Sequence, residues 1–503
     1  MAAVLHLVTA GPIRAVPRRP ARRGAMGSPS HDTRWLDATA QAQLVADGEA
    51  TPLELTDAAI ERIEQLDGPI NAVVVRWFEH ARELAASGDL PAGPFRGVPF
   101  LLKDLWAPYA GQPMTNGNVA LRDALPISPV DSTLVARFRS AGLVTLGRTN
   151  SPELGSLPVT EPVAYGPTRN PWNSDHTPGG SSGGAAAAVA AGMVPIAHAS
   201  DGGGSIRIPA SCCGLIGLKP SQGRITMGPL QTESALSVHL CVSRSVRDTA
   251  RLLDAVRGPG VGDTVIAPPP ARPYVDELGA DPGRLRIGLL DTDPRGFPLH
   301  ADCVAAVRSA AALLESLGHH VEHGHPAALS DASFTERFMS IWGANMAVGI
   351  AAYGQLLGRE LAEHEVEPVN WAQARSAERA SSADYAKGMA ATAEYRRAIQ
   401  QWWADGWDLL LSPTLSEPPV RIGEHDPQPG DPLAGMKRAR RFVSFTPPFN
   451  VSGQPAVNVP LHWNAAGLPV GVQLVAAYGR EDLLIRVAGQ LETARPWAHR
   501  IPG

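Results

Sequence analysis

The sequence predicts an α/β fold in which helices cover both faces of a central mixed β-sheet. Short apolar runs with strand character alternate with helix-like segments along most of the chain, which is typical of α/β architectures. Several of these runs are apolar at nearly every position, as expected for strands that are buried on both faces.

The first clear helix is expected in the segment ATPLELTDAAIERIEQL, residues 50–66. Thr51 is a suitable N-cap, Pro52 fits the first helical position, and Glu54 completes a capping box. The apolar residues that follow recur at helical spacing.

The next elements are a strand, a helix and a second strand. GVPFLLKDL, residues 97–105, is a short apolar run after a turn and predicts a buried strand. STLVARFRSAG begins a helix that Gly142 ends, and LVTLG, residues 143–147, predicts the following strand.

The middle and the end of the chain continue this alternation. A helix is expected at 184–192 and a strand at 193–200, followed by the glycine turn DGGGS at 201–205. Further strands are expected at 284–291, 319–323, 407–414 and 470–477, with a helix at 300–318 between the first two.

The chain is expected to fold as a single domain, residues 34–503, because no linker divides it. Residues of about 330–410 interrupt the alternation and predict a mostly helical insertion that could cover one side of a site. Residues 1–33 are expected to form a disordered N-terminal extension. Its arginines follow the short apolar stretch, whereas a secretory signal has the reverse order.

Charge and cysteine content narrow the function classes. The formal net charge is −5, which gives no electrostatic reason to expect nucleic-acid or anionic membrane binding. No apolar run approaches the roughly 20 residues of a membrane helix. Four cysteines, two of them adjacent, are too few for a disulfide framework and indicate a reducing compartment, hence the cytoplasm.

The segment TPGGSSGGAAAAVAAG, residues 177–192, requires an explanation because two serines on a glycine loop lead directly into an alanine-rich helix. A flexible linker is disfavoured, because a linker would lie between polar segments and this loop leads into a helix. A phosphate-binding loop is excluded, because such a loop ends in Gly-Lys-Ser/Thr and none follows here. The literal match to the G-x-S-x-G nucleophile motif is accidental, because a polar, proline-broken segment stands where that motif needs a strand.

A second serine, Ser205, follows three glycines at the end of the strand expected at 193–200. A tight glycine turn leaves several backbone N–H groups free of sheet hydrogen bonds, and such donors can converge on a developing negative charge. His198, inside the same strand, is expected to be a packed core histidine.

A base for such a serine could be Lys103, which ends the apolar run PFLLK. Burial penalises the charged ammonium and can lower its pKa by several units, which would make the amine a competent base near neutral pH. The alternative, a lysine whose ammonium reaches the surface, stays open at this point.

Three blocks together resemble the amidase signature family: Lys103 after GVPFLL, GGSSGG at 179–184, and DGGGSIRIPASCCGLIGLKPS at 201–221. The resemblance implies an amidase signature fold and hydrolysis of a carboxamide C–N bond through an acyl-enzyme. It implies Ser205 as nucleophile, Ser181 as the bridging serine at a cis peptide, and Lys103 as base. It also implies an oxyanion hole formed by the N–H groups of Gly202, Gly203, Gly204 and Ser205, with Ser182, Asp201 and Arg207 as supporting residues.

Other segments bear on the substrate. DATAQAQLV, RNPWN, PFNVSGQPA and VAAYGREDLL resemble family members that act on cyclic or linear ω-amino amides, so a small-molecule amide is the expected partner. The alternative is the amidase (A) subunit of a glutamine-dependent aminoacyl-tRNA amidotransferase. A non-catalytic binding relative is disfavoured by the complete set of three triad residues.

No cofactor is expected. The tract GHHVEHGH, residues 318–325, lacks the ligand spacing of a metal site and indicates a solvated strand edge. Trp342, Trp371, Trp402 and Trp403 either form an apolar wall of the substrate pocket or pack the insertion. The oligomeric state stays open, with a homodimer as one option.

Overall fold

The computed structural model describes residues 33–229 and 236–503. The extension expected at residues 1–33 lies outside the described residues, apart from Thr33.

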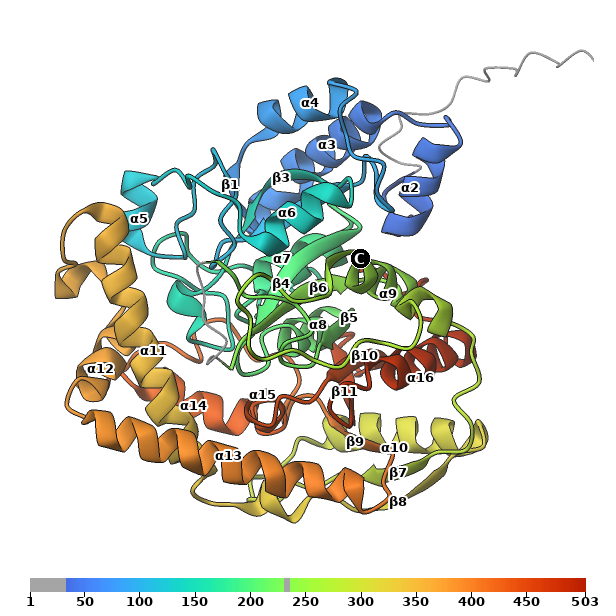
Figure 1. Cartoon of the computed structure of the whole chain (residues 1–503), viewed down its shortest axis with the longest axis vertical. Coiled ribbons are helices and arrows are strands. Elements are labelled where there is room, and N and C mark those ends of the chain that lie inside the picture. Colours follow the sequence, from blue (N-terminus) through green and yellow to red (C-terminus); the bar gives the residue numbers. More distant parts are fainter. Residues whose placement is uncertain (1–32, 230–235) are drawn as a thin grey trace, which may run out of the picture.

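Within the described part of the chain, one 11-stranded mixed sheet runs through the molecule in the order β1-β3-β2-β4-β6-β5-β10-β11-β9-β7-β8 (Figure 1). The parallel pairs are β2 with β3 and β4, and β7 with β8 and β9. The strands are β1 Val73–Arg76, β2 Pro99–Lys103, β3 Val144–Thr149, β4 Ile196–Asp201, β5 Ile216–Lys219, β6 Val238–Ser243, β7 Arg286–Leu289, β8 His320–His323, β9 Leu409–Pro413, β10 Ala456–Trp463 and β11 Pro469–Ala476.

Helices flank this sheet, and the central strands β2, β4, β6, β9 and β11 are buried at every position. Successive side chains of a strand point to opposite faces, so both faces are covered there, as predicted. The helices are α2 Ala38–Ala46, α3 Pro52–Ile70, α4 Phe78–Ala86, α5 Val119–Ala124, α6 Thr133–Ser140, α7 Gly183–Ala190, α8 Arg207–Cys213, α9 Val246–Val256, α10 Ala301–Ser316, α11 Phe334–Leu357, α12 Pro368–Ala377, α13 Ser382–Ala404, α14 Ala434–Phe442, α15 Pro448–Val451 and α16 Glu481–Ala494.

The predicted elements are confirmed, with shifted ends. Helix α3 begins with the predicted capping box of Thr51 and Glu54, and Pro52 occupies its first turn. The strand expected at 193–200 begins only at Ile196 and extends to Asp201. The segment 284–323 forms the parallel unit β7-α10-β8, and β8 lies at the sheet edge with His320 and His323 exposed, which confirms the solvated edge.

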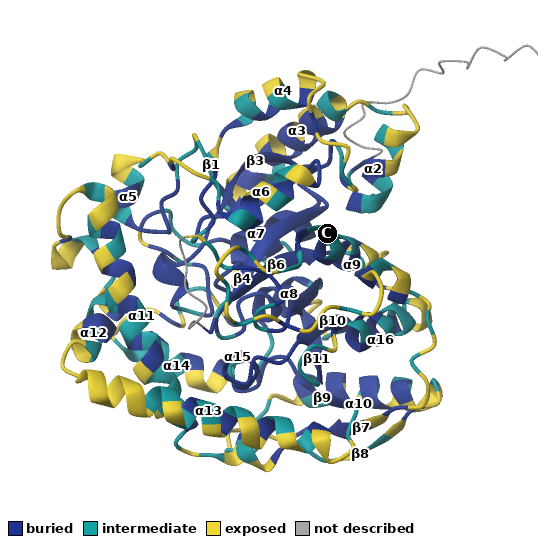
Figure 2. Cartoon of the chain, viewed as in Figure 1, coloured by how far each residue is buried: buried dark blue, intermediate teal, exposed yellow. Residues whose placement is uncertain are grey.

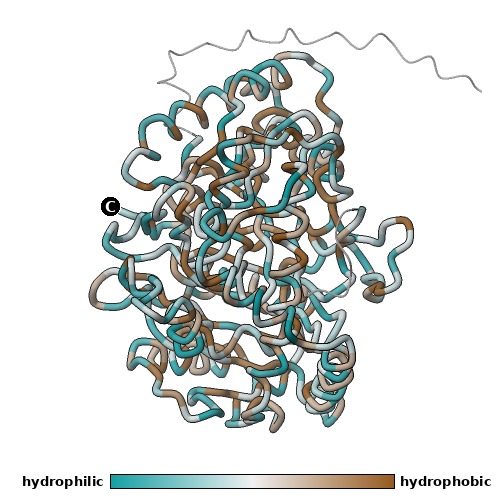
Figure 3. Tube along the Cα trace, turned by 90° about the vertical axis from the view of Figure 1, so that its left-hand side faces the viewer, coloured by the Kyte–Doolittle hydropathy of each residue, from teal (hydrophilic) through white to brown (hydrophobic). Residues whose placement is uncertain are grey.

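The insertion expected at about 330–410 contains the three helices α11, α12 and α13. Helix α13 lies on the outside of the molecule and is largely exposed, whereas α7 and α8 beside the sheet are buried throughout (Figure 2). The outer helices alternate between hydrophilic and hydrophobic residues (Figure 3), as expected for elements with one face on the core.

Two further findings concern the cysteines and the length of the apolar helices. All four cysteines are buried free thiols. Across residues 33–229 and 236–503, no helix combines the length and the apolar character that crossing a membrane requires.

Candidate active site

Lys103 lies at the end of the central strand β2 and is fully buried. Its Nζ donates hydrogen bonds to Ser181 Oγ at 2.7 Å and to Ser200 Oγ at 3.1 Å. Burial lowers the pKa of Lys103 to about 7, although the negative charge of Asp201 opposes the shift. A large fraction of the amine is therefore uncharged near neutral pH, as a general base requires.

Ser181 follows a cis peptide bond from Gly180 and is nearly completely buried. The backbone of Val159 lies so close to Gly180 that a Cβ atom there would be 2.5 Å from the Val159 carbonyl oxygen. Only glycine fits at this position. Helix α7, whose residues are all buried, begins two residues after Ser181 and anchors the loop.

Ser205 reaches the same cavity from the turn that follows β4. Its side chain is mostly buried but accessible, with 7% relative exposure. Among the described residues, no hydrogen bond joins the hydroxyls of Ser181 and Ser205, and catalytic hydrogen bonds often tighten only when substrate is bound. The structure thus brings Lys103 and Ser181 into direct contact and places Ser205 beside them.

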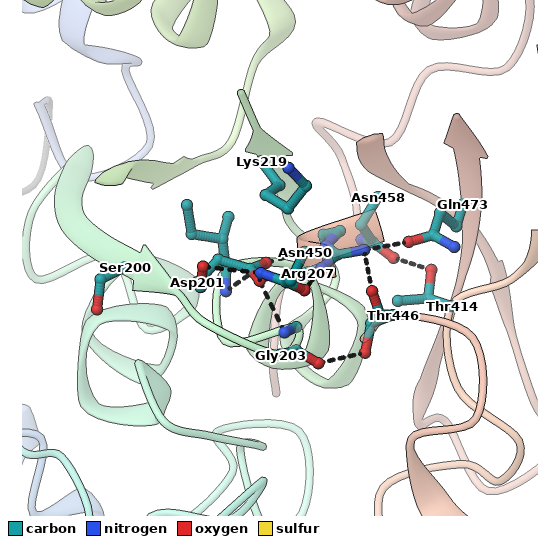
Figure 4. Close-up of polar contacts among 12 residues, drawn as sticks. Ser200, Asp201, Gly203, Arg207, Lys219, Thr414, Thr446, Asn450, Asn458 and Gln473 are labelled. Carbon is teal, nitrogen blue, oxygen red and sulfur yellow. Dashed lines mark hydrogen bonds and ion pairs between the residues drawn. The ribbon is translucent and has the colours of Figure 1, made fainter. Parts of the chain in front are cut away.

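Asp201 and Arg207 hold this turn together (Figure 4). Arg207 donates to both carboxylate oxygens of Asp201, at 2.9 and 3.0 Å, and also to Asn450 and Gln473. Burial alone would raise the pKa of Asp201, but the charge and the hydrogen bonds of Arg207 lower it to about 2. Asp201 therefore stays ionised and braces the turn.

The four N–H groups expected to form the oxyanion hole differ in their contacts. The N–H of Gly204 donates to Asp201 Oδ1 at 2.7 Å, so this donor is already used inside the turn. In the described part of the chain, the N–H groups of Gly202, Gly203 and Ser205 have no hydrogen-bond acceptor. These three remain as candidate donors for an oxyanion.

The active-site cavity has a volume of about 230 Å³. Helix α11 forms one wall with Trp342, Asn345, Met346 and Gly349, and the core forms the other with Trp106 and Leu154. No charged side chain is among the described residues that line it. His239, also in the lining, stays neutral because burial and the charge of Lys103 lower its pKa to about 3.

Ser182 and His198 support the site from behind. Ser182 Oγ accepts from the N–H of Ser200 at 3.3 Å and donates to its carbonyl at 3.2 Å, which fixes the end of β4. His198 Nδ1 accepts from the N–H of Lys103, and its Nε2 lies 2.9 Å from His239 Nδ1. His198 is fully buried, which confirms its expected place in the core.

Sequence reasoning missed several residues of the site. Nothing in the sequence marks Ser200 as a site residue, because it is a single polar residue at the end of a predicted strand. Asn345 and Trp106 enter the cavity only through the packing of α11 against the core. Of the four tryptophans considered, Trp342 forms part of the wall, while Trp402 and Trp403 pack against each other.

Comparisons with known proteins identify relatives of this chain. The sequence model of the family described as Amidase matches residues 54–485. The chain is 45% identical over 478 residues to the 6-aminohexanoate-cyclic-dimer hydrolase of Paenarthrobacter ureafaciens. The alignment covers 93% of this chain and 96% of that protein. A solved structure of 6-aminohexanoate cyclic dimer hydrolase superposes with a TM-score of 0.90 at 44% identity, covering 93% of this chain and 99% of the other.

A more distant similarity is to one subunit of the glutamyl-tRNA(Gln) amidotransferase of Thermotoga maritima. Its solved structure gives a TM-score of 0.73 at 27% identity and covers 93% of this chain and 96% of that one.

Proposed function

Since this chain belongs to the amidase family and is a hydrolase of amide C–N bonds, we propose that Lys103, Ser181 and Ser205 perform the reaction. The observation that carries this proposal is the contact of the buried Lys103 Nζ with Ser181 Oγ, 2.7 Å away, at the wall of a cavity that also contains Ser205.

In the acylation step, the uncharged Lys103 takes a proton from Ser181, which takes the proton of Ser205. Ser205 Oγ attacks the carbonyl carbon of the amide, and the resulting oxyanion accepts hydrogen bonds from the N–H groups of Gly202, Gly203 and Ser205. The proton returns through Ser181 to the leaving nitrogen. The C–N bond then breaks, and the acyl group remains on Ser205 as an ester.

Deacylation uses the same groups in reverse. A water molecule loses a proton to the Ser181–Lys103 pair and attacks the ester carbonyl, and the oxyanion is stabilised at the same three N–H groups. The tetrahedral intermediate collapses, Ser205 Oγ regains its proton, and the product leaves as a carboxylic acid that ionises in water.

We propose a small uncharged amide as the substrate, with the 6-aminohexanoate cyclic dimer or a related cyclic ω-amino amide as the first choice. Relatives at 45% identity are named for hydrolysis of that compound. Among the described residues that line the cavity none is charged, which supports this choice, because a charged group would lose hydration there without gaining an ionic partner from them. Asn345 offers an amide side chain to a substrate amide.

The test is turnover of the cyclic dimer by the purified chain, with acid quenching and mass spectrometry of peptides. We expect ring opening and an acyl adduct on the peptide that contains Ser205. Ser205→Ala abolishes both, whereas Ser237→Ala, a control in the same cavity, retains activity within about threefold. An adduct on another residue would contradict the assigned nucleophile.

The same experiment addresses the amidotransferase alternative. A component of such a complex would release ammonia from glutamine only with its partner subunits present, so amide hydrolysis by the isolated chain favours the free hydrolase.

The buried thiols support the proposal of a cytoplasmic, reducing location, which cell fractionation of the source organism tests. A homodimer stays a prediction.

A further inference from the structure

The turn that carries Ser205 is held by a distant part of the chain, residues 446–450, which lead into and begin α15. We name these residues the α15 segment. Its two polar residues, Thr446 and Asn450, are buried, and neither is among the described residues that line the active-site cavity. Their side chains contact carbonyl oxygens of the turn after β4, and Figure 4 shows both residues beside that turn.

Asn450 holds the peptide unit between Asp201 and Gly202. Its Nδ2 donates to the carbonyl of Asp201 at 2.9 Å and to Asp201 Oδ1 at 2.8 Å. This peptide bond is trans, so its C=O and its N–H point in opposite directions. Because the carbonyl is held on the side of Asn450, the N–H of Gly202 points away from Asn450. The contact thus fixes the direction of one candidate oxyanion donor.

Thr446 holds the peptide unit between Gly203 and Gly204. Its Oγ1 donates to the carbonyl of Gly203 at 2.7 Å, and the N–H of Gly204 donates to Asp201 Oδ1 at 2.7 Å. This peptide unit cannot rotate without losing a hydrogen bond, since both of its polar ends are bonded. The unit between Gly202 and Gly203, whose N–H is the second candidate donor, lies between the two held units.

The third candidate donor, the N–H of Ser205, depends on a local contact instead. The carbonyl of Gly204, in the same peptide unit, accepts from the N–H of Ile208 at 2.7 Å in the first turn of α8. By contrast, the contacts of Thr446 and Asn450 come from 243 and 249 positions further along the chain. The first two donors therefore depend on the packing of the α15 segment against the turn.

Arg207 fastens the α15 segment to the turn. Its guanidinium donates to the backbone carbonyl of Thr446 at 3.0 Å and to Asn450 Oδ1 at 2.7 Å, in addition to its two bonds to Asp201. Because Asn450 Oδ1 accepts from Arg207, the amide nitrogen of the same side chain faces Asp201. The orientation of the Asn450 side chain is thereby fixed.

We propose that Thr446 and Asn450 are positioning residues of the oxyanion hole. By holding two carbonyls of the turn, they keep the N–H groups of Gly202 and Gly203 directed toward the oxyanion that forms when Ser205 attacks an amide. Donors that are fixed in advance stabilise a transition state because they need no rearrangement during the reaction. This inference rests on the proposed function, in which these N–H groups stabilise the oxyanion.

The first test compares Thr446→Val, which replaces the hydroxyl by a methyl group, with Thr446→Ser, which retains the hydroxyl. In ring opening of the cyclic dimer, Thr446→Val should lower kcat about tenfold to a hundredfold, somewhat less than the loss of a whole oxyanion donor. Thr446→Ser should stay within about threefold of the native kcat. The dissociation constant of the cyclic dimer, measured on chains that also carry Ser205→Ala, should stay unchanged, because Thr446 does not line the cavity.

The matched control is Thr414→Val. Thr414 is also fully buried, and its hydroxyl donates to Asn458 Oδ1 at 2.6 Å, away from the turn. Thr414→Val therefore loses a comparable buried hydrogen bond and should leave kcat unchanged.

A second measurement does not depend on which amide is the substrate. When an alkyl trifluoromethyl ketone binds, Ser205 Oγ bonds to its carbonyl carbon, the carbonyl oxygen becomes an oxyanion, and the hydroxyl proton passes to the serine–lysine relay. The affinity for this probe thus reports the oxyanion hole. Thr446→Val should weaken it at least about tenfold. Asn450→Asp, which keeps an acceptor for Arg207 but loses the N–H donors, should do the same.

The outcomes separate this inference from the proposed function. Native affinity for the ketone in Thr446→Val and Asn450→Asp, or an equal loss in Thr446→Ser or Thr414→Val, overturns the positioning role. Should Thr446→Val not fold, the smaller Thr446→Ala takes its place in both measurements. If no chain opens the cyclic dimer while the ketone binds Ser205 and the losses appear as expected, the proposed substrate fails and the positioning role stands. If the native chain forms no adduct at Ser205, the assigned nucleophile is wrong and the positioning role falls with it.

Discussion

At the scale of single residues, the site depends on one amine in an environment that removes its charge. Lys103 has no carboxylate within hydrogen-bond reach among the described residues, and its Nζ contacts only two serine hydroxyls. Hydroxyl groups accept hydrogen bonds from an ammonium but compensate lost hydration only in part. The pKa of about 7 follows from this balance.

The two serines that contact Lys103 should differ in effect. Ser181→Ala breaks the path to Ser205, so we expect kcat to fall by roughly 10³-fold or more. Ser200→Ala removes only an acceptor that favours the ammonium, so kcat/KM should fall about tenfold or less. In Ser200→Ala, the acid limb of the pH profile of kcat/KM should therefore move to lower pH than in the native protein, where its apparent pKa is expected at about 7. Equal losses in both variants, or an unmoved limb, would contradict the relay.

At the scale of elements, the insertion is joined to the core by a buried carboxylate. Glu153 Oε2 accepts from the N–H of Glu367 at 2.9 Å and from Asn370 Nδ2 at 2.6 Å, both at the start of α12. Its Oε1 accepts from Asn118 at 2.6 Å. Two residues on, Gly155 has φ +67°, and a Cβ there would lie 3.1 Å from Ser181 Oγ. The same short turn thus holds α12 and borders the active site.

Glu153→Ala should therefore loosen α12 while the sheet stays intact. Removing this buried acceptor leaves the N–H of Glu367 without a partner and takes one of two acceptors from each of Asn118 and Asn370, which should cost about 2–4 kcal/mol of stability. Hydrogen exchange should accelerate in residues 368–377 and stay slow in β4. The control is Glu363→Ala, an exposed residue just before α12, which should leave both regions unchanged. Uniformly faster exchange would show that Glu153 serves general stability instead.

Elements with local signals could be predicted from the sequence, and those that depend on distant packing could not. The capping box at Thr51, the stop at Gly142 and the β7-α10-β8 unit all follow from residues within one or two turns. The sheet order, with β5 beside β10, joins segments far apart in the chain. The same limit applies to the site: the family motifs located Lys103 and the two serines, but the use of the Gly204 N–H inside the turn depends on where the Asp201 side chain points.

At the scale of the whole molecule, the folded protein holds two fully buried lysines. Besides Lys103, Lys219 at the end of β5 is fully buried, and burial together with the charge of Arg207 lowers its pKa to about 7. Between pH 7 and 10.5 the unfolded chain binds more protons at both lysines than the folded chain. Stability from these groups therefore rises with pH across that window and is lowest at and below pH 7.

Lys103→Met should consequently raise stability near pH 7 by roughly 1–3 kcal/mol while abolishing catalysis. The gain in stability should shrink as pH rises toward 10.5, because Lys103 then loses its proton in the unfolded chain as well as in the folded one. Melting temperatures of the variant and the native protein at about pH 7 and about pH 10 measure this difference. A gain that is constant with pH would mean that Lys103 is not neutral in the folded protein.

The most direct measurement is the titration of Lys103 itself by NMR of protein labelled with ¹³C at the lysine Cε. The chain has only four lysines, of which Lys387 and Lys437 are exposed, so Lys103→Met and Lys219→Met assign the two buried signals. We expect the Lys103 signal to titrate near pH 7. A signal that remains that of an ammonium up to about pH 9 would contradict the uncharged base on which the proposed mechanism depends.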